Sequence, residues 1–254
     1  MVKLNKIAAV SLLAARFASA STSKAVFRRQ NAVPIINANS PNPSWIRAQD
    51  GIWCAFATNN PGVTHVQVAS APAATGPWTV PNKDALATVG AWCNEIEVWA
   101  LDVRQVADGS YVLYYAGSPY GSNLTHCIST ATSPNPGGPF TPAATPFAYN
   151  IGQGGSIDPS GFEDVDGHQY VTYKIDGNSL KHGGDCLNSV PPLVSTPIML
   201  QEVEADGVTP IGKPVQILDR DDSDGPLVEA PGIVRTAEGV YILFHSSHRF
   251  TSPR

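Results

Sequence analysis

A short turn followed by an apolar strand occurs four times in this chain of 254 residues. Each time, an acidic residue and a glycine precede a run of aromatic and β-branched residues, and the glycines are Gly51, Gly109, Gly167 and Gly239. These glycines are 58, 58 and 72 residues apart. An Asp-Gly pair between two apolar segments predicts a β-hairpin, here with a type I′ turn in which both central residues have positive φ.

A second motif repeats with a similar step. Ala69-Ser70-Ala71-Pro72 leads to Gly76-Pro77-Trp78-Thr79, and 62 residues later Ala131-Thr132-Ser133-Pro134 leads to Gly138-Pro139-Phe140-Thr141. Self-similarity at a fixed long period is typical of solenoids, propellers and arrays. Because the repeated unit is built from strands and turns, we expect an all-β protein, a β-propeller with blades of about four strands.

The strand patterns group into four units without a linker between them. No stretch with a helical period follows the N-terminal segment, and Gly and Pro, 22 of each, punctuate the chain as in a turn-rich β-protein. A single propeller domain over residues 21–254 is therefore predicted. We expect its strands at 45–46, 52–58 and 65–69, a loop at 71–94, a second unit over 99–142, a third over 155–204 with a polar loop at 178–192, and a fourth from 227 onward.

The N-terminal residues 1–20 have the pattern of a signal peptide. Lys3 and Lys6 precede a short apolar stretch over residues 7–15, and Ala18-Ser19-Ala20 fits a cleavage site. A buried N-terminal helix is the alternative interpretation. Secretion to the extracellular space is therefore predicted, which permits disulfides among Cys54, Cys93, Cys127 and Cys186, in any of three complete pairings.

The charge pattern argues against several classes of partner. The net charge is −5, charged residues make up 15% of the chain, and no arginine-rich patch interleaved with aromatic residues occurs. A nucleic-acid or membrane partner is thus not expected, and we predict a monomer. The acidic run 219–224 fails the EF-hand pattern, because Arg220 stands at the first ligand position and Pro231 at the twelfth. We expect no metal and no cofactor.

A polar or acidic residue lies six to nine residues upstream of each of the four turns, and these residues are Asn42, Asp102, Asp158 and Glu229. If the four positions are equivalent, their side chains converge at one mouth of the propeller channel. Paired carboxyl groups perform glycoside hydrolysis, since one acid protonates the leaving oxygen and one carboxylate activates water or attacks carbon. For any single Asp-Pro, a turn or a cap is the simpler interpretation.

The chain resembles glycoside hydrolase family 43, in its fungal secreted branch, over roughly residues 35–254. The segments that carry the resemblance are Trp99-Ala100-Leu101-Asp102-Val103, Ser156 to Phe162, Tyr173 to Ser179, Leu218 to Pro231, and Phe244-His245-Ser246-Ser247. The resemblance implies a five-bladed propeller that hydrolyses α-L-arabinofuranosidic or β-D-xylosidic links of plant cell-wall arabinan or arabinoxylan with inversion. It implies that Glu229 is the general acid and that Asp158 orients this acid and tunes its pKa.

Other positions are assigned with less detail. Asp102 matches a third segment of the family, where substrate binding and a structural hydrogen bond are both compatible with the pattern. Trp45 and Trp99 flank the polar positions, and each is a candidate for stacking on a sugar or for core packing. The family has an Asp as catalytic base in the first blade, whereas this chain has Asn42.

Two consequences follow from this resemblance. An amide does not accept a proton from water, so a propeller that binds carbohydrate without cleaving it is the competing hypothesis. The visible units account for about four blades, and the fifth blade of the family is expected to be missing from this sequence.

Overall fold

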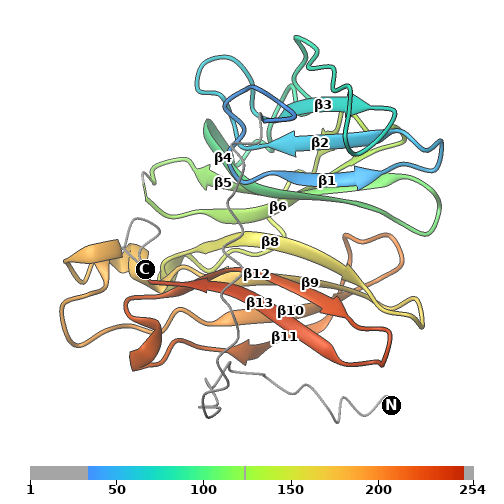
Figure 1. Cartoon of the computed structure of the whole chain (residues 1–254). Coiled ribbons are helices and arrows are strands. Elements are labelled where there is room, and N and C mark those ends of the chain that lie inside the picture. Colours follow the sequence, from blue (N-terminus) through green and yellow to red (C-terminus); the bar gives the residue numbers. More distant parts are fainter. Residues whose placement is uncertain (1–33, 123, 249–254) are drawn as a thin grey trace, which may run out of the picture.

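The computed structural model describes residues 34–122 and 124–248, which form four antiparallel sheets in chain order (Figure 1). In every sheet each strand pairs with the next one along the chain. The strands are β1 (Ser44–Arg47), β2 (Trp53–Ala57) and β3 (Gln67–Ala71); β4 (Cys93–Gln105), β5 (Tyr111–Pro119), β6 (Cys127–Ser133) and β7 (Thr141–Pro142); β8 (Ser156–Glu163), β9 (Gln169–Ile175), β10 (Ile198–Val203) and β11 (Pro210–Leu218); and β12 (Val228–Arg235) with β13 (Tyr241–Ser247).

The sheets stack one on the next as blades of a β-propeller, and this architecture confirms the predicted fold class. Figure 1 shows the first sheet at the top, the second below it, and the third and fourth sheets together in the lower half, where β12 and β13 overlap β9 to β11 in the view. The first strand of each sheet lies beside the first strand of the next, so β1, β4, β8 and β12 follow one another along the inner side. The only helical segments in the described residues are short 3₁₀ turns, namely η1 (Ile151–Gln153), η2 (Gly177–Leu180), η3 (Asp185–Leu187) and η4 (Asp222–Asp224).

The strand predictions hold in part. Strands β1, β2, β8, β9, β12 and β13 lie where the alternating patterns placed them, but β4 already begins at Cys93, inside the predicted loop 71–94. The third sheet also continues past residue 204 into β11. This strand is exposed along most of its length and contains Pro210, Gly212 and Pro214, residues that are depleted from central strands. β11 is therefore an outer strand. It lacks the alternation of apolar residues from which the neighbouring strands could be predicted.

The four repeated turns are hairpins, but the type I′ prediction is wrong. Only the glycine of each turn has positive φ, as in Gly51 at 85° and Gly109 at 87°, whereas the preceding acidic residue does not. In the first turn the Gly51 N–H donates to Ala48 O, and the Asp50 carboxylate accepts the Ile52 N–H at 2.9 Å. This side-chain bond keeps Asp50 in a right-handed conformation, so the turn is of type I followed by a left-handed glycine.

Apolar side chains fill the spaces between the first three sheets. One cluster joins the first and second sheets and includes Phe56, Leu113 and Tyr115, and another joins the second and third and includes Val112 and Val171. The third and fourth sheets meet instead through aromatic and polar groups. Phe162 and Tyr241 pack edge to face at 6.0 Å, and the Tyr241 hydroxyl donates to the Asp164 carboxylate.

Residues 1–20, the predicted signal peptide, lie outside the described residues. Within the described residues no helix is long and apolar enough to cross a membrane. The thiols of Cys54, Cys93 and Cys127 are buried, and none of the three forms a disulfide in the described part of the chain.

Candidate active site

The β-bulges of the inner strands define which residues of the four sheets are equivalent. Strand pairing is interrupted between Trp99 and Asp102, between Ile157 and Ser160, and between Glu229 and Gly232. A residue with positive φ lies inside each bulge, and the first sheet has such a residue before β1. These residues are Asn42 (48°), Ala100 (46°), Asp158 (57°) and Ala230 (52°), each eight positions before its turn.

The predicted equivalence of the four polar residues is therefore only half right. Asn42 and Asp158 are equivalent, but Glu229 lies one position earlier and Asp102 two positions later in its sheet. The positive-φ residue always lies eight positions before the turn, whereas the four polar residues lie six to nine positions before it. The unequal spacing in the sequence therefore reflects positions that are not equivalent. Glu229 shares its register position with Trp99 and Ile157.

Glu229 lies at the centre of a charged cluster formed by the third and fourth sheets. Its Oε2 is 3.6 Å from the Lys174 ammonium, which lies 2.7 Å from Asp176 Oδ1. The lysine side chain is 1% exposed and that of Glu229 31%, so of these two residues the glutamate is the one that reaches the surface. Burial raises the pKa of the Glu229 carboxyl; Lys174 opposes the shift, and Asp158 raises the pKa further.

Asp158 contacts the strand that carries Glu229. Its Oδ2 accepts the backbone N–H of Ala230 at 2.9 Å, so the aspartate of β8 is tied to the residue that follows the glutamate on β12. Burial also raises the pKa of Asp158, and the two carboxyls consequently compete for a proton. The Ala230 N–H stabilises the ionised form of Asp158 and so favours the proton on Glu229.

Asn42 lies at the corresponding position of the first sheet. The residue is exposed, and its Nδ2 donates to the Thr58 hydroxyl at 3.1 Å. The same hydroxyl oxygen accepts the Ala100 N–H at 3.3 Å, which links the first and second sheets at their bulges. The amide nitrogen of Asn42 is thus engaged with Thr58, and its carbonyl oxygen is the atom that remains to face solvent or substrate.

Asp102 has a structural role in this site. Its carboxylate accepts the Ser44 hydroxyl at 2.7 Å, the Gly161 N–H at 2.9 Å and the Arg104 guanidinium at 2.8 Å. Ser44 belongs to β1 and Gly161 to β8, so one side chain joins three inner strands. Of the two interpretations of Asp102, the structural hydrogen bond matches these contacts. Both carboxylate oxygens already accept hydrogen bonds from other residues of the protein.

The two tryptophans lie in different surroundings. Trp45 is 63% exposed, packs against Trp53 with tilted rings at 5.0 Å, and lines a cavity of about 220 Å³ toward the turn ends of β1, β4 and β8. Trp99 is half-buried and stacks on the His126 ring at 4.6 Å. Since Trp99 is in register with Glu229, it is the better placed of the two for contact with a substrate.

Sequence reasoning missed a second polar group beside this site. His126 Nε2 lies 3.0 Å from Glu97 Oε2, which also accepts the Ser118 hydroxyl at 2.9 Å. Burial lowers the pKa of His126, and Glu97 opposes the shift. The neutral ring is held between Trp99 and Glu97, and the backbone of His126 bridges to Gly155 just before β8. Only the proximity of Glu97 and Trp99 in sequence hinted at this cluster.

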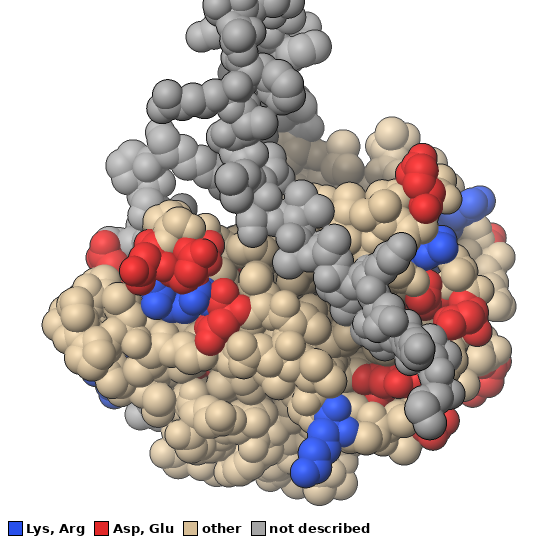
Figure 2. All heavy atoms as spheres, turned by 90° about the horizontal axis from the view of Figure 1, so that it is seen from below, with Lys and Arg blue, Asp and Glu red and all other residues tan. Residues whose placement is uncertain are grey.

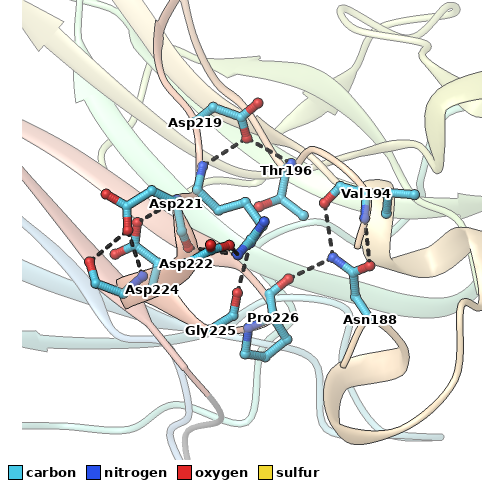
Figure 3. A network of polar contacts seen from close by, with 11 residues as sticks. Asn188, Val194, Thr196, Asp219, Asp221, Asp222, Asp224, Gly225 and Pro226 are labelled. Atoms are coloured by element: carbon cyan, nitrogen blue, oxygen red, sulfur yellow. Dashed lines mark hydrogen bonds and ion pairs between the residues drawn. The ribbon is translucent and has the colours of Figure 1, made fainter. Parts of the chain in front are cut away.

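A network of polar contacts fixes the loop that leads into β12 (Figure 3). The Arg220 guanidinium donates to Gly225 O and to Asp221 O, each at 2.7 Å, and Asp221 caps η4. Asp219 accepts the backbone N–H groups of Thr196 and Arg220. The side chain of Asn188, which is fully buried, donates to Pro226 O at 2.7 Å. The start of β12, and with it Glu229, is therefore held by the acidic loop.

This loop is organised around its own arginine and backbone. In the described residues no three or more His, Cys, Asp and Glu side chains are arranged to hold a metal ion. The carboxylates of Asp219, Asp221 and Asp224 instead accept N–H and O–H groups within the loop and from its neighbours.

The third and fourth sheets thus bring Glu229, its lysine partner and a neighbouring aspartate together at the inner strands of a β-propeller. The chain belongs to glycoside hydrolase family 43, because the model of "Glycosyl hydrolases family 43" matches residues 31–253. The family's members are five-bladed propellers, and four of the sheets are present in the described residues.

Individual relatives point to the same family. A "probable arabinan endo-1,5-alpha-L-arabinosidase C" of Aspergillus niger is 41% identical over 93 residues, which cover 34% of this chain and 26% of the relative. The endo-arabinase of Bacteroides thetaiotaomicron has a TM-score of 0.68 at 20% identity, over 86% of this chain and 74% of that one. A thermostable family-43 glycoside hydrolase has a TM-score of 0.67 at 21% identity, over 84% and 65%. The chain thus matches about a quarter of the curated relative's length, and the two structures show the fold alone.

Proposed function

We propose that this protein is a secreted hydrolase of plant cell-wall arabinan or arabinoxylan that acts on α-L-arabinofuranosyl or β-D-xylosyl links. The observation that carries the proposal is the pairing of the partly exposed Glu229 with the buried Lys174, beside Asp158, in a propeller of this family. The arabinan-cleaving relative of Aspergillus niger favours arabinan over xylan as the substrate. The substrate class is an oligosaccharide or polysaccharide in either case.

The mechanism is general acid–base hydrolysis with inversion. Glu229, whose pKa burial raises, gives its proton to the glycosidic oxygen as the bond to the anomeric carbon breaks and its electron pair moves to that oxygen. A water molecule bonds to the anomeric carbon from the opposite face, and its proton passes to the surrounding solvent, because the amide of Asn42 does not accept it. In inverting enzymes the acid and base carboxyls are about 6.5–9.5 Å apart, which leaves room for this water.

Asn42 favours a second candidate function. At the position of the base, an amide orients water through its oxygen but does not accept the proton that the water releases. The chain then binds oligosaccharide at the same surface and hydrolyses it slowly or not at all. This carbohydrate-binding function needs the same Glu229, Asp158 and Trp99 surface without the proton transfer.

Turnover and binding measured side by side distinguish the two functions. We expect release of oligosaccharides from linear arabinan, with the β-D-xyloside and α-L-arabinofuranoside of p-nitrophenol as comparison substrates. Glu229→Gln should abolish arabinan cleavage and spare the aryl glycosides, whose leaving groups need little protonation. Equal, small losses on both substrate types would remove Glu229 from the acid role.

Two further readouts complete the test. An NMR time course should show the inverted anomer as the first product, and a retained configuration would overturn the mechanism. Binding of arabino-oligosaccharides without turnover, measured by calorimetry, would establish the second candidate in place of the first.

A further inference from the structure

The lysine beside Glu229 is not used in the mechanism above, although it is the most buried charged group of the cluster. Lys174 projects from β9 with 1% of its side chain exposed, and Asp176, which is 7% exposed, holds its ammonium at 2.7 Å. Asp176 is itself fixed by the Ser179 hydroxyl of η2. A buried ammonium is stable only when it is closely paired. The contact with Asp176 therefore fixes the position of the Lys174 charge relative to Glu229.

We propose that Lys174 is a positioning residue that fixes which carboxyl oxygen of Glu229 carries the transferable proton. The inference rests on the proposed function, because it concerns the acid step. An ammonium donates hydrogen bonds and accepts none. Glu229 Oε2 lies 3.6 Å from the Lys174 ammonium. This oxygen therefore directs its lone pairs at the lysine and does not carry the proton. The proton then resides on Oε1, the oxygen turned away from Lys174.

This arrangement matters throughout the acid step. The proton leaves Oε1 for the glycosidic oxygen, which also receives the electron pair of the breaking bond. The carboxylate that results keeps its Oε2 beside the ammonium, so the charge that develops on Glu229 is met by a positive group already in place. A lysine with a purely structural role would need only Asp176 as its partner. The additional contact with Glu229, which reaches the surface, is what connects Lys174 to the acid step.

The charges that face Glu229 come from three directions. Asp158 of β8 and Asp176 after β9 disfavour its ionised form, and Lys174 favours it. His126, directly before β6, faces the two aspartates. Its ring is neutral because burial lowers its pKa. Across β13 the residue paired with Glu229 is Ser246, which does not titrate near neutral pH. Removal of the lysine charge should consequently raise the pKa of Glu229.

The titration of Glu229 is the decisive measurement, because it does not depend on turnover. We expect carboxyl ¹³C NMR of the full chain to show a Glu229 pKa about one pH unit or more higher in Lys174→Met than in the unmodified protein. Lys174→Arg, which keeps the positive charge, is the matched control and should leave the value nearly unchanged. In active protein the basic limb of kcat/KM should move to higher pH in Lys174→Met while kcat falls at least tenfold.

Loss of folding is separated from loss of positioning by a second variant. Lys174→Met combined with Asp176→Asn removes the buried pair together, leaves the net charge unchanged and should still raise the Glu229 pKa. An unchanged Glu229 titration in folded Lys174→Met or in the double variant would overturn the role of Lys174. Full turnover of arabinan by Glu229→Gln would instead remove the proposed function, so the two failures are distinguishable.

Discussion

Asn42 and Asp158 share a left-handed backbone φ, 48° and 57°, whereas the chemistry of their side chains is different. Both residues have positive φ directly before a proline, a conformation that L-residues other than Asn and Asp seldom adopt. Asn and Asp tolerate it because their short polar side chains bond locally. The shape of the first sheet therefore accepts either residue at position 42, and the catalytic consequence is a matter of protonation alone.

We predict that Asn42→Asp raises kcat on arabinan by about a hundredfold, with little change in KM, because general-base assistance is typically worth ~10²–10⁴. The Thr58 hydroxyl, which now accepts from Asn42, rotates to donate to the new carboxylate and still accepts the Ala100 N–H. Steady-state kinetics on arabinan checks this expectation.

Asn42→Ala is the matched control, since it removes the amide without adding a base. Its kcat should not rise. If the unmodified protein already turns over at the rate of an ordinary glycosidase, another group serves as base and the assignment of position 42 is wrong.

The hairpins show how far local pattern determines the elements. Each turn carries its own signal in an acidic residue, a glycine and an alternating strand, so most strands could be predicted without tertiary information. β11 could not, because an exposed outer strand with prolines and glycine lacks that alternation. The site could also be predicted only in part. Glu229 and Asp158 follow from motif resemblance. The pairing of Glu229 with Lys174 joins residues that are far apart in sequence, and it becomes visible only when β9 and β12 are neighbours.

Asp102 provides a test of how the inner strands are held together. We predict that Asp102→Ala lowers the free energy of unfolding by about 2–4 kcal/mol, since three donors from β1, β4 and β8 lose a shared, largely buried acceptor. Chemical denaturation followed by tryptophan fluorescence measures the loss.

The control for this variant is Asp108→Ala, at the exposed turn of the same hairpin, where the carboxylate accepts only from Ser110. It should lower the free energy of unfolding much less than Asp102→Ala does. Equal effects of the two substitutions would show that Asp102 does not join the sheets in solution.

The surface of the molecule is uneven in its charge. Figure 2 shows the lower side, where charged side chains gather in a few separate clusters and wide uncharged areas lie between them. β11 and β13 lie at this side in Figure 1, and both carry exposed apolar residues, among them Val215 at 61% and Phe244 at 58%. In the described residues β13 pairs only with β12, so its outer edge offers unpaired backbone groups next to apolar side chains.

We therefore predict weak, concentration-dependent self-association through β13, which Phe244→Lys should reduce. An exposed apolar edge strand pairs readily with another copy, and a lysine there opposes the contact by its charge and hydration. Sedimentation velocity over a range of protein concentrations should show a rising average mass for the unmodified chain and a constant one for the variant. Val165→Lys, which places the same charge at a turn residue that is 75% exposed, is the control and should leave the association unchanged. A constant monomer mass for the unmodified chain would contradict this prediction and support the expectation that the protein is a monomer.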